Sequence, residues 1–140
     1  MELHVFDYNT YTYVVSAGYP KPINQELPAP SPPQTNAATI IGDVVYLLHG
    51  SQMYSYTISG TSPTYSYTFI SQFDYTVNHA NNPFSAQPGS PLTSAPTGVT
   101  AMSTDFYGEV TIAIATRQLY RYTASTGHWE LKGDMTWPCD

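Results

Sequence analysis

The sequence contains very little charge of either sign and is especially poor in basic residues. Of 140 residues, four are Lys or Arg and ten are Asp or Glu, which gives a formal net charge of -6. Nucleic acids and anionic membranes are bound through clusters of Lys and Arg, so this composition argues against both as partners. Charged residues make up 10% of the chain, against roughly one quarter in most globular proteins. We expect a polar, uncharged surface, which suits contact with proteins, glycans or further copies of the chain.

Cysteine and long apolar runs are also scarce. Cys139 is the only cysteine, so no internal disulfide and no cysteine zinc site can form, and the sequence leaves open whether this thiol is free or bridged to another chain. No stretch of 18 apolar residues is present, which argues against membrane insertion. The compartment is left open, with an extracellular, surface or virion-associated location favoured.

No metal or cofactor site is predicted. The histidines have no His neighbour at the spacings i+2 or i+4 that mark zinc sites. They are His4, His49, His79 and His128. The sequence also has no nucleophile elbow, phosphate loop or dinucleotide fingerprint. Asp105 and Glu109 flank a turn, where Asp is common for backbone reasons alone. We therefore expect a protein that is not an enzyme.

Helical periodicity is missing as well. Twelve prolines interrupt the chain, and no window places apolar residues at i, i+3, i+4 and i+7 between capping signals. Alternating runs rich in aromatic and β-branched residues, such as "ELHVFDY" and "YTYVVS", are typical of strands instead. The sequence predicts an all-β fold.

Turn signals and proline-rich stretches divide one expected domain, residues 1–140, into segments. Six prolines between residues 19 and 37 predict an extended or irregular linker. The expected segments are a hairpin at 1–18, this linker at 19–37, a four-stranded antiparallel meander at 38–73, a long loop at 74–98, a second meander at 99–135 and a tail at 136–140.

Three stretches share one pattern, in which an aromatic strand and a short turn lead to a second aromatic strand. They are "LHVFDYNTYTYVV" (3–15), "MYSYTISGTSPTYSYTFI" (53–70) and "LYRYTASTGHWEL" (119–131), and they place Trp129 where Tyr11 and Tyr65 stand. With the glycine-turned hairpins before the last two copies, this pattern resembles the kelch repeat of β-propellers. The paired glycines typical of kelch blades are reduced to His49-Gly50 in one copy and replaced by "IAIA" in the other.

The resemblance implies propeller-like blades, in which large aromatic side chains fill the space between neighbouring sheets. Two full blades and a partial third cannot close a ring, so we expect a homo-oligomer or a part of a larger assembly. The alternative fold is a two-sheet β-sandwich. The residues expected in the aromatic core are Tyr46, Tyr56, Tyr122 and Trp129.

Long loops often carry function, so we expect the loop at 74–98 to be the binding site of a non-enzymatic interaction module that recognises a protein or a glycan. On this hypothesis, deleting residues 79–90 leaves folding intact. The alternative is a self-assembling structural protein, such as a fibre, coat or spike subunit. The candidate ligand-binding residues are Tyr75, His79, Asn81, Asn82 and Phe84.

Overall fold

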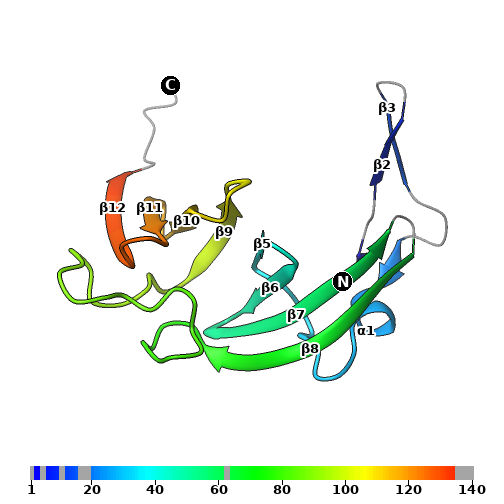
Figure 1. Ribbon diagram of the computed structural model, residues 1–140, viewed down its shortest axis with the longest axis horizontal. Helices are drawn as coiled ribbons and strands as arrows, with labels where there is room; N and C mark the ends of the chain where they lie inside the picture. Colours follow the sequence, from blue (N-terminus) through cyan, green and yellow to red (C-terminus); the bar gives the residue numbers. More distant parts are fainter. Residues whose placement is uncertain (1, 4–5, 10–11, 16–19, 62–63, 135–140) are drawn as a thin grey trace.

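The chain forms an all-β structure, as the sequence predicts. The computed structural model describes residues 2–3, 6–9, 12–15, 20–61 and 64–134, with side chains from residue 20 onward (Figure 1). Two four-stranded antiparallel sheets and two two-stranded sheets are present, and neither large sheet is closed. Within the described residues, no helix is long and apolar enough to cross a membrane. The tail at 136–140, with Cys139, lies outside these residues, as do His4 and Tyr11.

The first large sheet has the strand order β5-β6-β7-β8. Its first two strands form from the two predicted apolar runs, and Gly42, at a φ of 62°, supplies the left-handed backbone of the turn between them. The register of β7 and β8 passes from Ser55–Ser71 to Tyr56–Phe69, so Ile70 is an extra, bulged residue. The strands are β5 (Ala37–Ile41), β6 (Val44–His49), β7 (Gln52–Thr61) and β8 (Thr64–Asp74).

The second large sheet has the order β12-β11-β10-β9 and is again a meander. The run "DFYG" forms the turn between its first two strands, as predicted. Thr116 and Arg117 both have positive φ in the next turn, a conformation that the two-residue hairpin connection requires. The strands are β9 (Val99–Thr104), β10 (Val110–Ala115), β11 (Gln118–Thr123) and β12 (His128–Asp134).

The N-terminal segment adds short elements beside the first sheet. The predicted hairpin is present as the pair β2 and β3, which stands apart from the two large sheets in Figure 1. The proline-rich segment is more ordered than expected, since it contains a strand that pairs with β1 and a one-turn helix. These elements are β1 (Glu2–Leu3), β2 (Phe6–Asn9), β3 (Thr12–Val15), β4 (Lys21–Pro22) and α1 (Ile23–Glu26).

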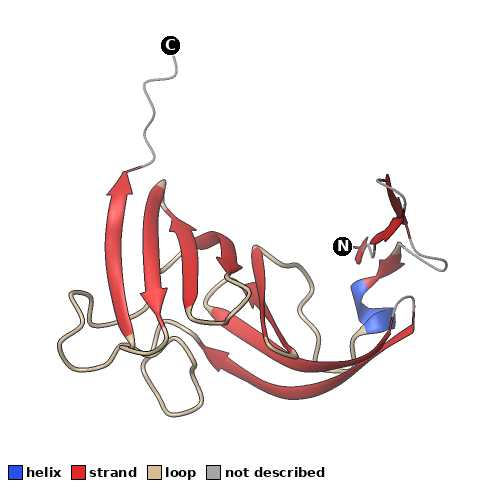
Figure 2. Cartoon of the chain, turned by 45° about the horizontal axis from the view of Figure 1, so that its top comes forward, coloured by secondary structure: helices blue, strands red, loops and turns tan. Residues whose placement is uncertain are grey.

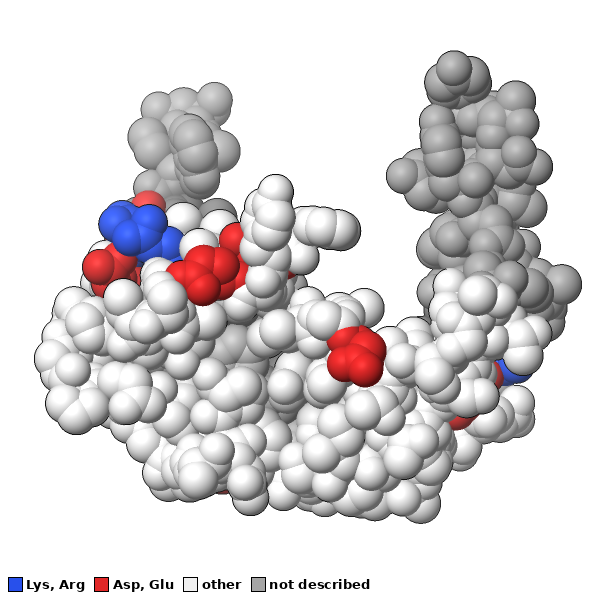
Figure 3. Space-filling view, in the orientation of Figure 1, with Lys and Arg blue, Asp and Glu red and all other residues white. Residues whose placement is uncertain are grey.

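The two large sheets meet along β5 and β9, which lie side by side (Figures 1 and 2). A chain of threonine hydroxyls joins them: Thr39 Oγ1 lies 2.6 Å from Thr104 Oγ1, which lies 2.9 Å from Thr111 Oγ1. Thr39 and Thr111 are buried, so these hydrogen bonds give their hydroxyl groups partners at the junction of the two sheets. On the outer surface, much of the face in Figure 3 carries no charged side chain.

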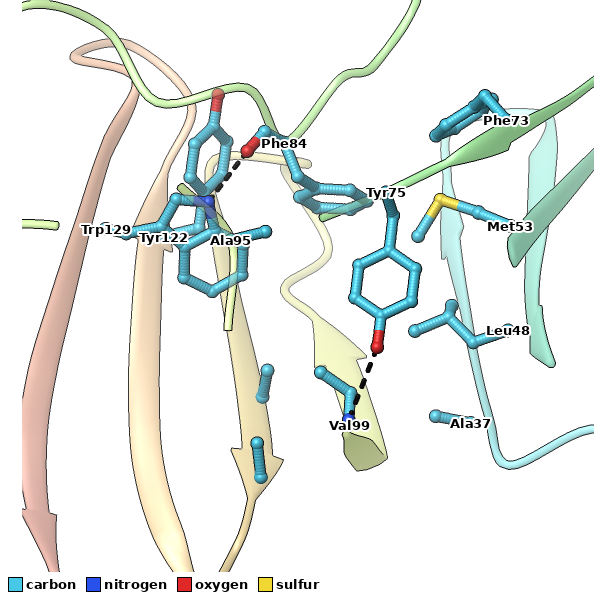
Figure 4. Close-up of a cluster of buried hydrophobic side chains, with 12 residues drawn as sticks. Ala37, Leu48, Met53, Phe73, Tyr75, Phe84, Ala95, Val99, Tyr122 and Trp129 are labelled. Atoms are coloured by element: carbon cyan, nitrogen blue, oxygen red, sulfur yellow. Dashed lines mark hydrogen bonds between the residues drawn. The ribbon is translucent and has the colours of Figure 1, made fainter. Parts of the chain in front are cut away.

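One hydrophobic core unites both sheets with the long loop (Figure 4). Burial of apolar surface is the main stabilising term in folding, and here each of the three parts supplies several buried side chains. The first sheet contributes Ala37, Leu48, Met53 and Phe73, the second contributes Ala113, Ala115, Tyr122 and Trp129, and the loop contributes Tyr75, Phe84 and Ala95.

The opposite face of the first sheet has a second, smaller core. Ile23 and Leu27, at either end of the helical turn, pack against Leu47, Tyr54 and Tyr56. The hydroxyl of Tyr56 donates a hydrogen bond to the carbonyl of Pro30. Part of the expected linker therefore covers this sheet face and is not a spacer.

The resemblance to kelch propellers is wrong. The chain forms two separate four-stranded sheets that fit a two-sheet β-sandwich better than propeller blades. The repeat reflects side chains that alternate between the two faces of a strand, a pattern common to antiparallel hairpins with one buried face. Trp129 and Tyr65 do occupy matching places, each in the second residue pair from its hairpin end. However, Trp129 is fully buried, whereas Tyr65 is partly exposed.

Buried phenols make the fold sensitive to alkaline pH. Burial raises the pKa of Tyr46, Tyr67, Tyr75 and Tyr122 and raises that of Tyr56 to about 12. Because the unfolded value is about 10, the folded state favours the neutral phenol. This stability is fully present below about pH 10 and is lost as the pH rises to about 12. We expect the urea midpoint to fall over that interval, together with rising tyrosinate absorbance. A constant midpoint would contradict this prediction.

Candidate functional site

The loop at 74–98 forms part of the core in the structure. The side chains of Tyr75 and Phe84 are each only 1% exposed. The Phe84 ring packs edge-on to the rings of Tyr46 and Tyr122, at centroid distances of 5.9 and 5.5 Å. It meets the Trp129 ring in a tilted geometry at 6.1 Å. Phe84 therefore fills the space above both sheets, and its face is not available to a ligand.

Asn82 shapes the loop from inside. Its Nδ2 donates to the carbonyls of Tyr75 (3.0 Å) and Val77 (2.9 Å), and its Oδ1 accepts from the backbone N–H of Phe84 (3.0 Å). A buried amide needs such partners, because an unpaired polar group costs about 1–3 kcal/mol. Asn82 thus connects separate parts of the loop backbone. Because its side chain is buried, it is not available to a ligand.

Trp129 attaches the loop to the second sheet. Its Nε1 donates to the carbonyl of Phe84 over 2.7 Å, and its backbone N–H donates to Oγ of Ser90 over 2.9 Å. Leu92 also forms a backbone bridge with Trp129. The Trp129 ring lies 5.0 Å from that of Tyr122, in the cluster drawn in Figure 4. These contacts explain why a tryptophan stands at this place in the last hairpin.

The structure does not gather the five candidate ligand-binding residues on one surface. Tyr75, Asn82 and Phe84 are buried, which corrects the expectation that they face a ligand. His79 and Asn81 lie at the surface, where His79 Nδ1 accepts the backbone N–H of Asn81 over 3.2 Å. A shallow polar cavity of about 320 Å³ runs beside His79, and its lining includes Asn78, Ser85, Gln87 and Tyr122.

The core aromatics divide between the two clusters. Tyr122 and Trp129 are buried in the main core, and Tyr46 is partly buried against it. Tyr56 is fully buried in the smaller core on the opposite sheet face. Within the part of the chain that the structure describes, no three His, Cys, Asp or Glu side chains are arranged to hold a metal ion.

The most exposed large apolar side chains lie elsewhere, in the turn between β9 and β10. We call residues 105–109 the aromatic turn. Its Phe106 is 98% exposed and its Tyr107 is 88% exposed, and their rings pack edge-on with a centroid distance of 5.7 Å and an interplanar angle of 86°. Large apolar side chains are usually buried, so two adjacent aromatic rings almost entirely in solvent are an unusual feature.

Backbone and carboxylate hydrogen bonds hold the aromatic turn in one conformation. Oδ1 of Asp105 accepts the N–H of Glu109 over 2.8 Å, and the carbonyl of Asp105 accepts the N–H of Gly108 over 3.1 Å. Gly108 has a φ of 70°, and a Cβ there would lie 3.1 Å from Ile41 of β5. The carboxylate of Glu109 accepts a hydrogen bond from the Ser125 hydroxyl. The turn is therefore held by hydrogen bonds within itself and to Ser125, while its two aromatic rings are exposed.

Sequence reasoning identified this segment only as a turn. The available signal was the pair Phe106–Tyr107 within four turn residues. Strand alternation buries at least one of two adjacent residues, but a turn between strands has no covering sheet. Two consecutive large aromatics in such a turn therefore indicate exposure.

A second surface feature is an apolar groove of about 310 Å³ on the first sheet, beside the helical turn. Ile40, which is 53% exposed, is one of its lining side chains. Tyr67 of β8 and Ile23 of α1 lie on its sides. The groove continues the smaller core outward to solvent.

Comparisons with known proteins find no family model and no curated protein sequence that match this chain.

Proposed function

We propose that the chain is a non-enzymatic protein-interaction module whose aromatic turn inserts into a pocket on a partner protein. The observation that carries this proposal is the nearly complete exposure of Phe106 and Tyr107. Aromatic side chains that fill pockets supply much of the binding energy at protein interfaces. The braced backbone reduces the conformational entropy lost on binding.

The geometry of the rings favours a protein over a glycan. Sugars stack on flat aromatic faces, but Phe106 and Tyr107 meet edge-on at 86° and together form a compact projection. Burial of Tyr75 and Phe84 also removes the aromatic faces on which glycan recognition by the long loop would depend. A concave apolar pocket accommodates such a projection better than a sugar ring does.

Charge around the turn supports a partner with a basic rim. Asp105 and Glu109 flank the two rings, and the chain has a net charge of -6. Complementary charge increases the association rate and selects among partners. The same acidic flanks oppose insertion into an anionic membrane surface.

The proposal is tested by photo-crosslinking from the aromatic turn. A benzophenone amino acid at position 107 is expected to form adducts with a discrete protein in an extract of the cells that produce the chain. Unlabelled wild-type chain should compete for these adducts, and the variant Phe106→Ser/Tyr107→Ser should not. The free energy of unfolding of that variant should change by no more than about 0.5 kcal/mol, as for other surface substitutions.

The matched control places the benzophenone at Val77, an exposed apolar residue of the long loop. Equal adducts from position 77, or equal competition by the double serine variant, would contradict the proposal.

A second function, self-assembly as a structural subunit, is favoured by a separate observation. The outer edge of β8 is long and carries no charge between Thr64 and Phe73.

A further inference from the structure

The outer edges of the two large sheets differ in how they are protected. Exposed edge strands offer unpaired backbone groups to other chains, and natural proteins block them with charge, proline, short length or a covering segment. The edge strand β12 has such protection, because Leu92 of the loop bridges to Trp129 and three charged residues follow. Two of them, Glu130 and Lys132, lie 3.7 Å apart, and Arg121 approaches Glu130 to 2.6 Å.

Among the residues that the structure describes, nothing gives the edge strand β8 comparable protection. Its 11 residues make it the longest strand that the structure describes, and Thr64–Phe73 contains neither a charged residue nor proline. One side of β8 pairs with β7 along its whole length. On the other side, no described strand is hydrogen-bonded to it. Its outward backbone groups are therefore available for pairing.

The conformation of β8 is suited to such pairing over most of its length. The single bulge lies at Ile70, which is 49% exposed, so Thr64–Phe69 forms a regular stretch on the far side of the bulge. A bulge ends regular pairing locally and increases twist. We therefore expect any added strand to pair with residues 64–69 and to diverge near residue 70.

We propose that β8 pairs antiparallel with β8 of a second copy of this chain, across a two-fold axis, to form one continuous eight-stranded sheet. A two-fold axis perpendicular to a strand relates it to its copy in the antiparallel sense, and such an interface uses the same residues twice. Thr, Tyr and Ser dominate residues 64–68, so no like charges face each other. Main-chain hydrogen bonds supply the contact, as in other cases of strand addition.

The apolar groove on the first sheet supports a second copy of the chain as the partner of β8. Tyr67 lies both on β8 and in the lining of the apolar groove, with Ile58 beside it on β7. Pairing across β8 would make the groove-bearing faces of two copies continuous and would place the two Tyr67 side chains near the junction. The interface would then combine backbone pairing with burial of apolar surface. This inference does not depend on the aromatic turn, which lies on the other sheet.

The solution mass of edge variants tests this inference. Light scattering should give the wild-type chain about twice its mass of 15.4 kDa, at concentrations up to about 100 μM, where micromolar contacts are occupied. Ser66→Lys/Thr68→Lys places like charges on both copies at exposed positions of β8 and should give a monomer. The matched control, Leu131→Lys, adds a lysine at an exposed position of the other edge strand and should remain dimeric.

Cysteine cross-linking keeps the test decisive if the lysine variant fails to fold, as circular dichroism would show. In a Cys139→Ser background, single cysteines at each of positions 64–69 are compared. Antiparallel self-pairing predicts that disulfide dimers form most readily at the position nearest the two-fold axis, since only there are the two Cα atoms within disulfide reach of roughly 4.4–6.8 Å.

The inference would be overturned by a monomeric wild-type chain, a folded lysine variant that stays dimeric, loss of the dimer in Leu131→Lys as well, or equal or absent cross-linking at all six positions. Open-ended polymers would also contradict it, because an isologous contact closes at two copies.

Discussion

Replacing Trp129 with Ala is expected to lower the free energy of unfolding by about 3–5 kcal/mol, the usual effect of emptying a large aromatic core site. Trp129 is fully buried and packs against Tyr122 and Phe84. Its loss would also leave the carbonyl of Phe84 without the indole donor that it has at 2.7 Å. Urea denaturation followed by circular dichroism measures the change.

The control variant is Trp129→Phe. It keeps a buried ring but removes the indole N–H, so it should cost less than the alanine variant. A cost below about 0.5 kcal/mol for Trp129→Ala, typical of surface sites, would mean that the loop and the second sheet do not share this core.

Replacing residues 79–90 with a Gly/Ser linker of equal length is expected to abolish cooperative unfolding of the chain. The segment contains Asn82, Phe84 and Ser90, and all three connect the loop to the core or to Trp129. The replacement removes the side chain that fills the space above both sheets. This result is the opposite of the one expected if the loop were a surface binding segment. Calorimetry or urea denaturation measures the cooperativity.

Asn81→Ala is the matched control within the same segment, because Asn81 is exposed. It should change the free energy of unfolding by no more than about 0.5 kcal/mol. If the chain with the linker unfolds at the same urea concentration as the wild type, the loop is not structural and its binding role would have to be reconsidered.

The strands could be predicted from the sequence because their signal is local. Short apolar runs such as "VVYLL" and "TIAIA", bounded by glycine or turn residues, predict strands without knowledge of the partner surface. The all-β class and the four-stranded meanders are confirmed for this reason. The same local signal produced the kelch resemblance, since a repeated hairpin pattern does not specify how the sheets are arranged.

The role of the long loop could not be predicted in this way. Proline, asparagine and serine in residues 74–98 correctly indicate a segment without regular strands, but whether Phe84 is buried depends on residues 38 positions away or more, such as Tyr122 and Trp129. Tyr75 carries a local signal of burial. It continues the alternation of Phe73 two residues earlier, and both side chains are buried. In the aromatic turn, the turn residues indicate the backbone conformation but not that both aromatic rings are exposed.

The exchange rate of the Trp129 indole proton, measured by NMR, tests the central claim most directly. The central claim is that the long loop is a structural part of the core. It predicts that this proton, bonded to the carbonyl of Phe84, exchanges as slowly as the amides of β10 and β11, because all of them exchange only on global unfolding. Assignment uses Trp137→Phe, which leaves one indole signal. Exchange at the rate of an exposed indole would show that the loop opens independently of the sheets and would contradict the account.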